Sequence, residues 1–376
     1  MDADEPHRPP RKPRVAVVFG GRSPEHAVSC VSAGSVLRAI DRTAYDIVPV
    51  GITTEGRWVL ERDEPERLAF GPGYQPSVDP TGTAVVLPAD PASRGLIVCQ
   101  AAAMPRELAD IDVVFPVLHG PYGEDGTIQG LLELAGVPYV GSGVFASAAA
   151  MDKGHNKALL AAAGLPVGPH VVVGPRQWHE DPAAVRAAVD ALGMPVFVKP
   201  ARAGSSLGIT KVKTLDDLDA AIGQARGHDP RIVVEAAIEG REIECGVLEG
   251  LAGGGPQTSV VAEITVVGDH EFYDFTAKYL DGTTRLDVPA DVPVEVAARL
   301  RAMASAAYEA LSCEGLARVD FFLRRNGSIV VNEVNTMPGF TPTSMFPLLW
   351  AASGLDYPAL VSRLIRTALA RTPGLR

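Results

Sequence analysis

The stretch that decides the fold is residues 318–340, RVDFFLRRNGSIVVNEVNTMPGF, in which two apolar runs flank RRNGS. An Asn-Gly pair between runs rich in β-branched and aromatic residues is the strongest short-range signal of a β-hairpin. We predict a two-residue type I′ turn centred on Asn326 and Gly327, which pairs Arg325 with Ser328. Every other cross-strand pair of the hairpin follows from that turn.

Four polar residues interrupt the apolar runs of this hairpin. The predicted register sets Asp320 opposite Glu333. It also sets Arg318 opposite Asn335, and the two-residue period of a strand points all four side chains to one face. Facing carboxylates repel each other, so this face is either solvated or built around a cation. The opposite face is apolar, which favours the cation, and oxygen ligands predict Mg²⁺ or Mn²⁺ held together with a substrate phosphate.

The composition is that of an ordinary globular protein. Its 376 residues are 47% hydrophobic and 21% charged, enough for two or three domains with sizeable cores. The net charge of −11 argues against nucleic-acid and membrane partners. No run approaches the roughly 20 apolar residues that span a bilayer. The four cysteines form no CxxC pair, which indicates a reducing compartment, so we expect a cytoplasmic protein.

The order of the strand and helix patterns divides the chain into four parts. Residues 1–13 are polar and Pro-rich, which indicates a disordered tail. Residues 14–144 alternate β-rich and helical runs, as in a doubly wound α/β domain, apart from a Pro-, Gly- and Asp-rich insertion near 55–100. Residues 145–238 form a central unit, and residues 239–376 form a third, sheet-rich unit that ends in a helix.

A glycine- and serine-rich loop in the central unit is the candidate phosphate site. Residues 198–212, VKPARAGSSLGITKV, predict strand–loop–strand, whereas a Walker loop has GxxxxGK[ST] and opens a helix. Gly204 and Gly208 would let backbone N–H groups approach an anion closely. The alternative is a flexible hairpin tip. Further donors would come from the loop, its base and a helix predicted over 145–163, namely Ser205, Ser206, Lys199 and Lys157.

Acidic residues near the predicted strand ends are candidates for binding other groups. Glu235 ends one strand and Glu242 begins the next, where carboxylates could accept hydrogen bonds from an adenine amino group and ribose hydroxyls. Glu25, in FGGRSPEH at the start of a helix, either complements the helix dipole or binds an ammonium group. The same segment is not GxGxxG, which argues against a nicotinamide dehydrogenase.

Two loops supply the remaining candidates. His119 follows a predicted strand of the first domain, at the edge where open α/β sheets bind ligands, although a structural histidine is the alternative. In PGFTPTSM (338–345), Gly339 offers a backbone N–H to a developing oxyanion. Ser344 and the N–H of Met345 could bind a carboxylate there, unless this is an ordinary Pro- and Gly-rich loop.

Taken together, these segments resemble the ATP-grasp family, and within it most closely the D-alanine–D-alanine ligases. The resemblance implies an α/β fold of three domains, with ATP clasped between the central and C-terminal domains. The matching segments follow the family's order from about residue 14 to 370: GGRSPEHAVS, LHGPYGEDGTIQG, MDK…K, VKPARAGSSLG, VVEAAIEGREIE, DFTAKY, ARVDFFL and NEVNTMPGFTPTSM.

The resemblance also implies a role for each matching residue. Glu25 would bind the ammonium of the first D-alanine, linked by hydrogen bonds to Ser205 and Tyr279. Arg318 and the N–H of Gly339 would stabilise the transition state. The others would hold the first carboxylate (His119), the second carboxylate (Ser344, Met345), the ATP phosphates (Lys157, Lys199, Lys278, with Ser206), adenine and ribose (Glu235, Glu242), and two Mg²⁺ or Mn²⁺ ions (Asp320, Glu333, Asn335).

The implied reaction converts one D-alanine to an acyl phosphate with ATP, after which the amine of a second D-alanine displaces phosphate and gives D-alanyl-D-alanine for peptidoglycan precursors. A homodimer is expected. Tyr279 favours D-alanine over D-serine or D-lactate as the second substrate, whereas Ala27 departs from the acidic residue of EHEVS in many members. The alternatives are a ligase for another second substrate and a non-catalytic nucleotide-binding regulator, against which the intact hairpin residues argue.

Overall fold

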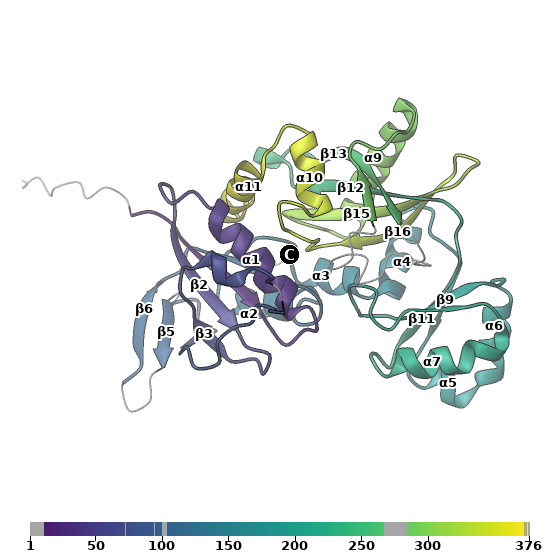
Figure 1. Ribbon diagram of the computed structural model, residues 1–376, viewed down its shortest axis with the longest axis horizontal. Coiled ribbons are helices and arrows are strands. Elements are labelled where there is room, and N and C mark those ends of the chain that lie inside the picture. Colours follow the sequence, from purple (N-terminus) through teal and green to yellow (C-terminus); the bar gives the residue numbers. More distant parts are fainter. Residues whose placement is uncertain are drawn as a thin grey trace, which may run out of the picture.

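The computed structural model describes residues 11–71, 73–93, 95–99, 104–266, 284–371 and 374. Lys278, Tyr279 and residues 1–10 of the predicted tail lie outside these ranges. Three β-sheets dominate the molecule, with the N-terminal sheet at one end of its long axis and the central sheet at the other (Figure 1). Within the described ranges, no helix is both long and apolar enough to cross a membrane. The α/β fold class with three units is confirmed, while the domain limits stay a prediction.

The first sheet has seven strands in the order β6-β5-β4-β3-β2-β1-β7. Its parallel part is β1 (Arg14–Gly20), β2 (Asp46–Ile52) and β7 (Val113–Val117). The predicted insertion extends this sheet with antiparallel strands β3 (Trp58–Leu60), β4 (Thr83–Val86) and β5 (Gly95–Cys99), followed by β6 (Arg106–Asp110). A short 3₁₀ helix, Pro65–Leu68, lies between β3 and β4.

Residues 11–13, which the sequence predicts as part of the tail, contact the first domain. Arg11 donates two hydrogen bonds, of 2.6 and 3.0 Å, to the carboxylate of Asp112. The backbone N–H of Asp46 donates to the carbonyl of Pro13. Residues 11–13, predicted as part of the tail, are therefore attached to the first sheet, because their neighbour β1 pairs there.

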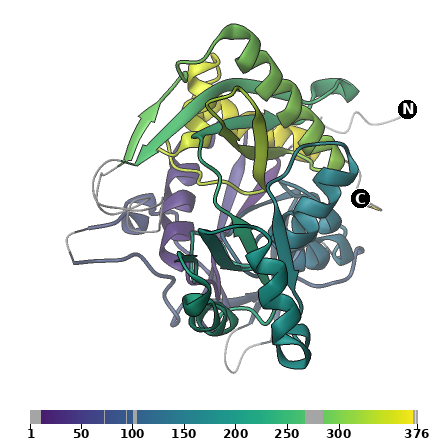
Figure 2. The ribbon, with the colours of Figure 1, turned by 90° about the vertical axis from the view of Figure 1, so that its right-hand side faces the viewer.

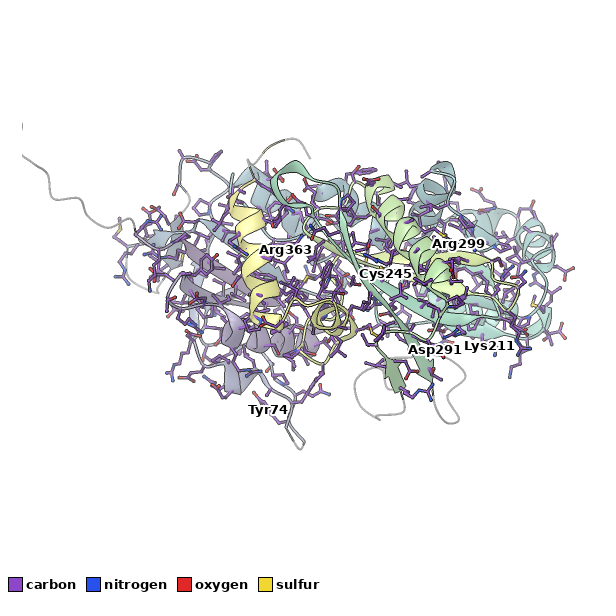
Figure 3. The ribbon with its side chains drawn as sticks, turned by 90° about the horizontal axis from the view of Figure 1, so that it is seen from above. Tyr74, Lys211, Cys245, Asp291, Arg299 and Arg363 are labelled. Carbon is purple, nitrogen blue, oxygen red and sulfur yellow. The ribbon has the colours of Figure 1, made fainter. Side chains whose placement is uncertain are left out.

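Helices from both ends of the chain cover the first sheet. Helix α1 (His26–Ala39) and the C-terminal helix α11 (Tyr357–Leu369) share one core cluster with β1 and β7. Helix α2 (Thr127–Leu134) packs in the core on the other face. In Figure 3 the yellow α11 lies over the purple N-terminal part. Helix α11 was predicted to finish the third unit, so its packing ties that unit to the first.

The central sheet is antiparallel, in the order β10-β9-β11-β8. Alternate residues of its strands, such as Val196, Val198 and Val234, pack against helices on one face. The period of two sends the residues between them, such as Lys199 and Glu235, to the opposite face. The elements are β8 (His170–Val173), α5 (Gln177–Glu180), α6 (Pro182–Asp190), β9 (Val196–Pro200), β10 (Thr210–Val212), a 3₁₀ turn (Leu215–Asp217), α7 (Leu218–Arg226) and β11 (Ile232–Ala236).

The third sheet is also antiparallel, in the order β14-β13-β12-β15-β16. Helix α9 (Val294–Ala310) covers its apolar face, and α10 (Met345–Ala352) covers part of the other face. Gly246 permits the approach of α10, because a Cβ there would lie 2.9 Å from the indole nitrogen of Trp350. The strands are β12 (Arg241–Leu248), β13 (Gln257–Val266), β14 (Thr284–Asp287), β15 (Leu316–Leu323) and β16 (Ile329–Asn335), with a 3₁₀ turn at Leu251–Gly253.

The turn between β15 and β16 differs from the prediction. Arg324, not Arg325, faces Ser328, and the backbone N–H of Arg324 donates to the Ser328 carbonyl at 2.9 Å. Gly327 adopts a φ of +79° and donates its N–H to the Arg324 carbonyl. The loop therefore has three residues and ends in a left-handed glycine, the arrangement of a type I turn with a glycine bulge. The predicted two-residue type I′ turn is wrong.

The predicted register is wrong by one position next to the turn, at residues 321–323, but it is correct farther from the turn, at residues 318–320. Phe321 faces Val331, but Asp320 faces Glu333, so β16 contains a bulge at Asn332. This extra residue offsets the extra residue of the turn, because each shifts the pairing by one position. Arg318 consequently faces Asn335, as predicted.

The helical run predicted over 145–163 is two helices. Helix α3 (Val144–Met151) ends at Asp152, and α4 (Lys153–Ala162) begins directly after it. The Asp152 carboxylate accepts hydrogen bonds of 3.0 Å from the N–H groups of Gly154 and His155. A side chain of this kind stabilises the first turn of a new helix. The change of direction sets the face of α4 that carries Lys153 and Lys157 against β16.

Candidate active site

A cavity of about 1200 Å³ lies where the central and third sheets meet the loops of the first. Strands β9 and β11 supply one wall, β12, β15 and β16 supply another, and the loops after β1 and β7 close one end. Every predicted site residue within the described ranges lines this cavity: Glu25, His119, Lys157, Lys199, Ser205, Ser206, Glu235, Glu242, Arg318, Asp320, Glu333, Asn335, Gly339, Ser344 and Met345.

Two lysines share one carboxylate in the central wall. Lys157 of α4 and Lys199 of β9 lie 3.2 and 2.8 Å from the carboxylate of Glu235. Although burial opposes its charge, the two ammonium groups lower the pKa of Glu235 to about 2. Burial lowers the pKa of Lys157, whereas at Lys199 the charge of Glu235 outweighs burial and raises the pKa. The cluster has a net positive charge and suits a polyphosphate.

The same cluster bears on the role predicted for Glu235. Its carboxylate binds the lysines, so contact with adenine would have to share that carboxylate. Lys157 also donates a hydrogen bond of 3.0 Å to the carbonyl of Asn332, the bulged residue of β16. The bulge therefore joins the lysine cluster to the third sheet.

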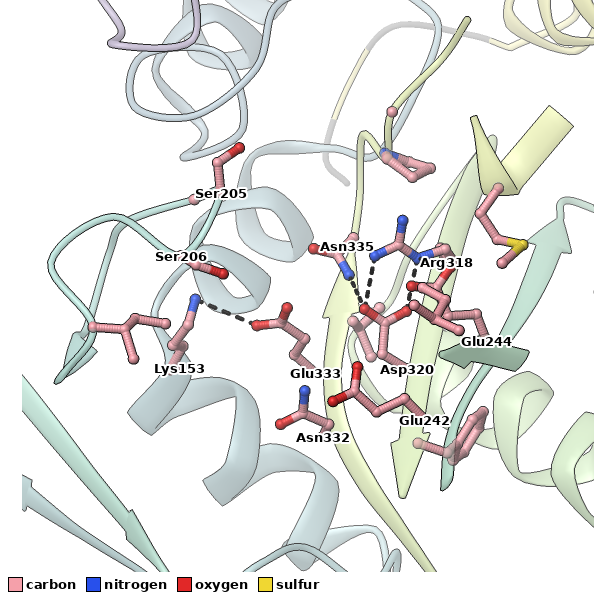
Figure 4. A pocket seen from close by; sticks show the side chains of 18 of the residues that line it. Lys153, Ser205, Ser206, Glu242, Glu244, Arg318, Asp320, Asn332, Glu333 and Asn335 are labelled. Carbon is pink, nitrogen blue, oxygen red and sulfur yellow. Dashed lines mark hydrogen bonds and ion pairs between the residues drawn. The ribbon is translucent and has the colours of Figure 1, made fainter. Parts of the chain in front are cut away.

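The polar face of the hairpin forms the opposite wall. Arg318 donates hydrogen bonds of 2.7 and 2.8 Å to the two oxygens of Asp320 (Figure 4). The side-chain amide of Asn335 donates to Asp320 at 2.9 Å. Glu333 lies 3.3 Å from the ammonium of Lys153. The repulsion expected between the two facing carboxylates is thus relieved by one cation on each.

These residues have the donors that a hard divalent cation needs. Asp320 and Glu333 point into the cavity from adjacent strands, and the orientation of the Asn335 amide leaves its oxygen directed away from Asp320 (Figure 4). In the part of the chain that the structure describes, no three acidic, His or Cys side chains converge closely enough to form a ready-made metal cluster. The chemistry of the oxygen donors fits Mg²⁺. For the ion to bind, Asp320 would have to move from Arg318 and Glu333 from Lys153.

The loop after β9 brings a serine to the first domain. Ser205 donates a hydrogen bond to Glu25, whose side chain is buried. Ser205 and Ser206 have φ values of +47° and +59°, a strained conformation that non-glycine residues adopt where the surroundings enforce it. A Cβ at Gly204 would lie 2.6 Å from the Glu25 carboxylate, so this close approach requires glycine. The hydrogen bond expected between Ser205 and Glu25 is present, while the role of the pair stays a prediction.

A buried histidine and a buried carboxyl lie beside Glu25. His119 contacts the hydroxyl of Ser32 at 3.0 Å and the carbonyl of Met337 at 3.3 Å, and burial lowers its pKa. Glu124 accepts a hydrogen bond of 2.6 Å from the N–H of Gly120. Burial, reinforced by the charge of Glu25, raises the pKa of Glu124 to about 8. The Glu124 carboxyl therefore binds its proton more tightly than an exposed glutamate does.

The raised pKa of Glu124 makes a testable contribution to stability. When the pKa of a carboxyl is higher in the folded than in the unfolded chain, the folded protein loses stability as the pH rises through the folded-state pKa of that carboxyl. Glu124→Gln removes that loss, so between pH 5 and 9 the thermal midpoint of the variant should fall less steeply than that of wild type. Parallel thermal melts across this range, with the exposed Glu309→Gln as control, measure the effect. Equal slopes for all three proteins would contradict it.

The loop after β16 faces the hairpin. Gly339 lies in the cavity wall, where a Cβ would be 3.2 Å from the hydroxyl of Ser344. The Thr341 N–H donates to this hydroxyl at 3.2 Å. Met345 begins α10, so its N–H belongs to a first helical turn that lacks intrahelical acceptors. Such a turn favours an anion, which supports the predicted carboxylate site.

Five charged residues that line this cavity have no role in the sequence-based prediction, namely Glu124, Lys153, Lys211, Glu239 and Glu244, and three of them lie next to predicted site residues. Lys153 precedes Lys157 by four residues, the spacing that sets two side chains on one helical face. Glu124 follows His119 in a glycine-rich loop, and Glu244 follows Glu242 on the same face of β12. The spacing alone could have indicated Lys153 and Glu244, whereas Glu124 becomes visible only through its burial.

Three sheets around a cavity that joins a lysine cluster to an acidic hairpin define an ATP-grasp ligase. Two family models match the chain, D-ala D-ala ligase N-terminus over residues 14–142 and D-ala D-ala ligase C-terminus over 159–366. The chain belongs to the D-alanine–D-alanine ligase family, whose members are ATP-dependent.

Individual relatives agree with this assignment over nearly the full chain. The D-alanine–D-alanine ligase of Streptomyces griseus is 56% identical over 100% of this chain and 97% of its own length. That of Kineococcus radiotolerans is 59% identical over 97% of this chain and 99% of its own. Among solved structures, the VanG D-Ala:D-Ser ligase of Enterococcus faecalis has a TM-score of 0.82 and 37% identity, covering 95% of this chain and all of the other. The D-alanine-D-alanine ligase of Coxiella burnetii has a TM-score of 0.78 and 34% identity, covering 96% and 95% of the two chains.

Proposed function

We propose that this chain joins two D-alanine molecules at the expense of ATP and so makes D-alanyl-D-alanine for peptidoglycan precursors. The observation that carries the proposal is that one cavity contains three chemically distinct parts. The Lys157–Lys199 cluster suits a polyphosphate, the Arg318–Asp320–Glu333 wall suits developing charge, and the Glu25–Ser205 pair suits an ammonium group.

The first step is phosphoryl transfer to a carboxylate. An oxygen of the first D-alanine attacks the γ-phosphorus of ATP, the bond to the bridging oxygen breaks, and ADP leaves. Such a step needs positioning and neutralisation of charge rather than a covalent nucleophile. Lys157, Lys199, Lys278 and the loop of Ser206 would hold the phosphates, and Glu235 with Glu242 would hold adenine and ribose. Asp320, Glu333 and Asn335 would hold two Mg²⁺ or Mn²⁺ ions, which supply electrostatic stabilisation of the phosphate oxygens when bound.

The second step forms the peptide bond. The ammonium of the second D-alanine first loses a proton to solvent, and the resulting amine attacks the acyl carbon. The tetrahedral intermediate then expels phosphate, which takes up the second proton from the nitrogen. Arg318 and the Gly339 N–H would stabilise the negative oxygen that develops on that carbon. Glu25, oriented by Ser205 and Tyr279, would bind the first ammonium group, and His119 would lie by the first carboxylate. Ser344 and the N–H of Met345 would bind the second carboxylate.

The choice of the second substrate can be tested directly. With ATP and Mg²⁺, phosphate release should depend on D-alanine and should be at least about tenfold slower when D-serine or D-lactate is offered as the second substrate, because a mismatched polar group costs about 1–3 kcal/mol. Mass spectrometry of the product identifies the dipeptide, and L-alanine is the negative control. Without D-alanine-dependent phosphate release the proposal fails. Preferential formation of the D-serine product would instead support the specificity that the VanG protein's name describes.

Three predictions accompany this function. The domain limits at 14–144, 145–238 and 239–376, a homodimer and a cytoplasmic location are all expected of such a ligase. The unpaired state of Cys30, Cys99, Cys245 and Cys313 supports a reducing compartment. Light scattering on the purified chain would test the dimer.

A further inference from the structure

Three carboxylates form a row across the third sheet. On β15, Asp320 faces Glu333 of β16 on one side and Glu244 of β12 on the other. All three line the cavity, and Glu244 is only 4% exposed. Three adjacent acidic side chains on one face are unfavourable unless cations lie among them. A cation next to Glu244 is therefore needed to offset its charge.

The cation next to Glu244 is Arg318. The Nε atom of Arg318 lies 3.0 Å from the Glu244 carboxylate and 2.7 Å from that of Asp320. Its Nη2 atom lies 2.8 Å from the second Asp320 oxygen. The position facing Arg318 on β12 is Gly246, which has no side chain to obstruct the guanidinium. Arg318 is thus bound by two carboxylates at once (Figure 4).

Of the two carboxylates that bind Arg318, only Asp320 is also a predicted metal ligand. A divalent cation at Asp320 competes with Arg318 for the same two oxygens, because an oxygen that donates its lone pairs to a metal is a weaker acceptor for a guanidinium. Glu244 lies on the far side of Arg318 from Glu333, in the order of the strands. It can therefore continue to bind Arg318 after Asp320 has turned to the metal.

We propose that Glu244 is a positioning residue that retains Arg318 when Asp320 binds a divalent cation. Without Glu244, Arg318 would stay on Asp320 and oppose the metal, or would lose its orientation toward the reacting carbonyl. Glu244 thereby links metal binding to the placement of the group that stabilises the transition state. The inference rests on the proposed function and names the partner of one of its residues.

Metal affinity separates this role from direct ligation. Full-length wild type, Glu244→Gln, Arg318→Met and the double variant are titrated with Mn²⁺ in the presence of ADP, and free Mn²⁺ is followed by electron paramagnetic resonance. Glu244→Gln should weaken Mn²⁺ binding about tenfold, as expected for loss of one close charge pair. Arg318→Met should tighten binding, because it removes the competitor for Asp320. In the Arg318→Met background, Glu244→Gln should have no further effect.

Activity gives a second readout. Glu244→Gln should lower kcat about 10- to 100-fold, with a smaller change in the KM for D-alanine, because an interaction made mainly in the transition state is lost. The control is Glu263→Gln on β13, which removes another Arg–Glu pair, 2.6 Å from Arg241, outside the cavity. It should leave both Mn²⁺ affinity and kcat unchanged. Glu244→Met, tested in parallel and checked by thermal melts, covers the case in which the Gln variant does not fold.

Two results would overturn the role proposed for Glu244. Equal weakening of Mn²⁺ binding by Glu244→Gln with and without Arg318 would show that Glu244 acts on the metal itself and would overturn the proposal. Unchanged Mn²⁺ affinity and kcat in both Glu244 variants would overturn it as well. Failure of the proposed function appears separately, as a wild-type protein that binds Mn²⁺ but releases no phosphate with D-alanine.

Discussion

Glu333→Gln is expected to lower kcat by at least about a thousandfold, a loss typical of removing one central electrostatic group. Glu333 faces Asp320 across the hairpin and lies 3.3 Å from the ammonium of Lys153. An amide of the same shape lacks the negative charge with which Glu333 would hold a divalent cation. Coupled assays of phosphate release over a range of Mg²⁺ concentrations would measure the loss.

The same variant should remain folded. The Glu333 side chain is 29% exposed, and its ion pair with Lys153 is partly screened by solvent. We expect the unfolding free energy to stay within about 1 kcal/mol of wild type. Glu309→Gln, on the exposed face of α9, serves as the control for a lost carboxylate. Wild-type turnover by Glu333→Gln would remove the metal assignment, while a matching loss in the control would point to a general charge effect.

Glu235→Gln is expected to have the largest effect on stability, a loss of roughly 3–5 kcal/mol. The substitution leaves Lys157 and Lys199 buried and close together without their shared carboxylate. The pKa of Glu235 is lowered to about 2, so its stabilising contribution is present above the ordinary pKa of a glutamate and is lost as pH falls toward 2. Urea denaturation at pH 7 and at pH 3 should show a smaller difference between wild type and variant at the lower pH.

A second substitution can restore the balance of charge. Adding Lys157→Met to Glu235→Gln removes one of the two buried ammonium groups, so the double variant should recover part of the lost stability. ATP binding should remain weak, because Lys157 is one of the groups proposed to hold its phosphates. If the double variant is as unstable as the sum of the single variants, repulsion between the two lysines is not the cause.

The hairpin shows how far local sequence signals reach. The apolar runs and the Asn-Gly pair were sufficient to predict two paired strands and the pairing of Asp320 with Glu333. The predicted turn was wrong by one residue, and the bulge at Asn332 was not predicted. The two deviations cancel, so the register was right although its derivation was not. The bulge has a partner far away in sequence, since the Asn332 carbonyl accepts from Lys157, and no local pattern could have indicated it.

The partners of the charged residues were also beyond the reach of sequence patterns. Glu235 ends a strand in the sequence as predicted, but its binding of two lysines depends on the packing of α4 against β9 and β11. Arg318 was assigned a role through resemblance, while its anchoring by Glu244 appears only when β12 pairs with β15. The packing of α11 on the first sheet was likewise not predictable from local patterns, because it joins segments from the two ends of the chain.

The sequence by itself indicated an α/β chain of three units, the candidate site residues that the structure brings together in one cavity and, through resemblance to known ligases, the family. Strand periods, glycines and the order of motifs can be read from the sequence without knowledge of the packing. Only the tertiary structure decided which charge neutralises which: Glu235 with Lys157 and Lys199, Glu333 with Lys153, and Arg318 with both Asp320 and Glu244. The physical reason is that ion pairs and pKa shifts depend on distance and burial, which long-range pairing of strands and helices alone establishes.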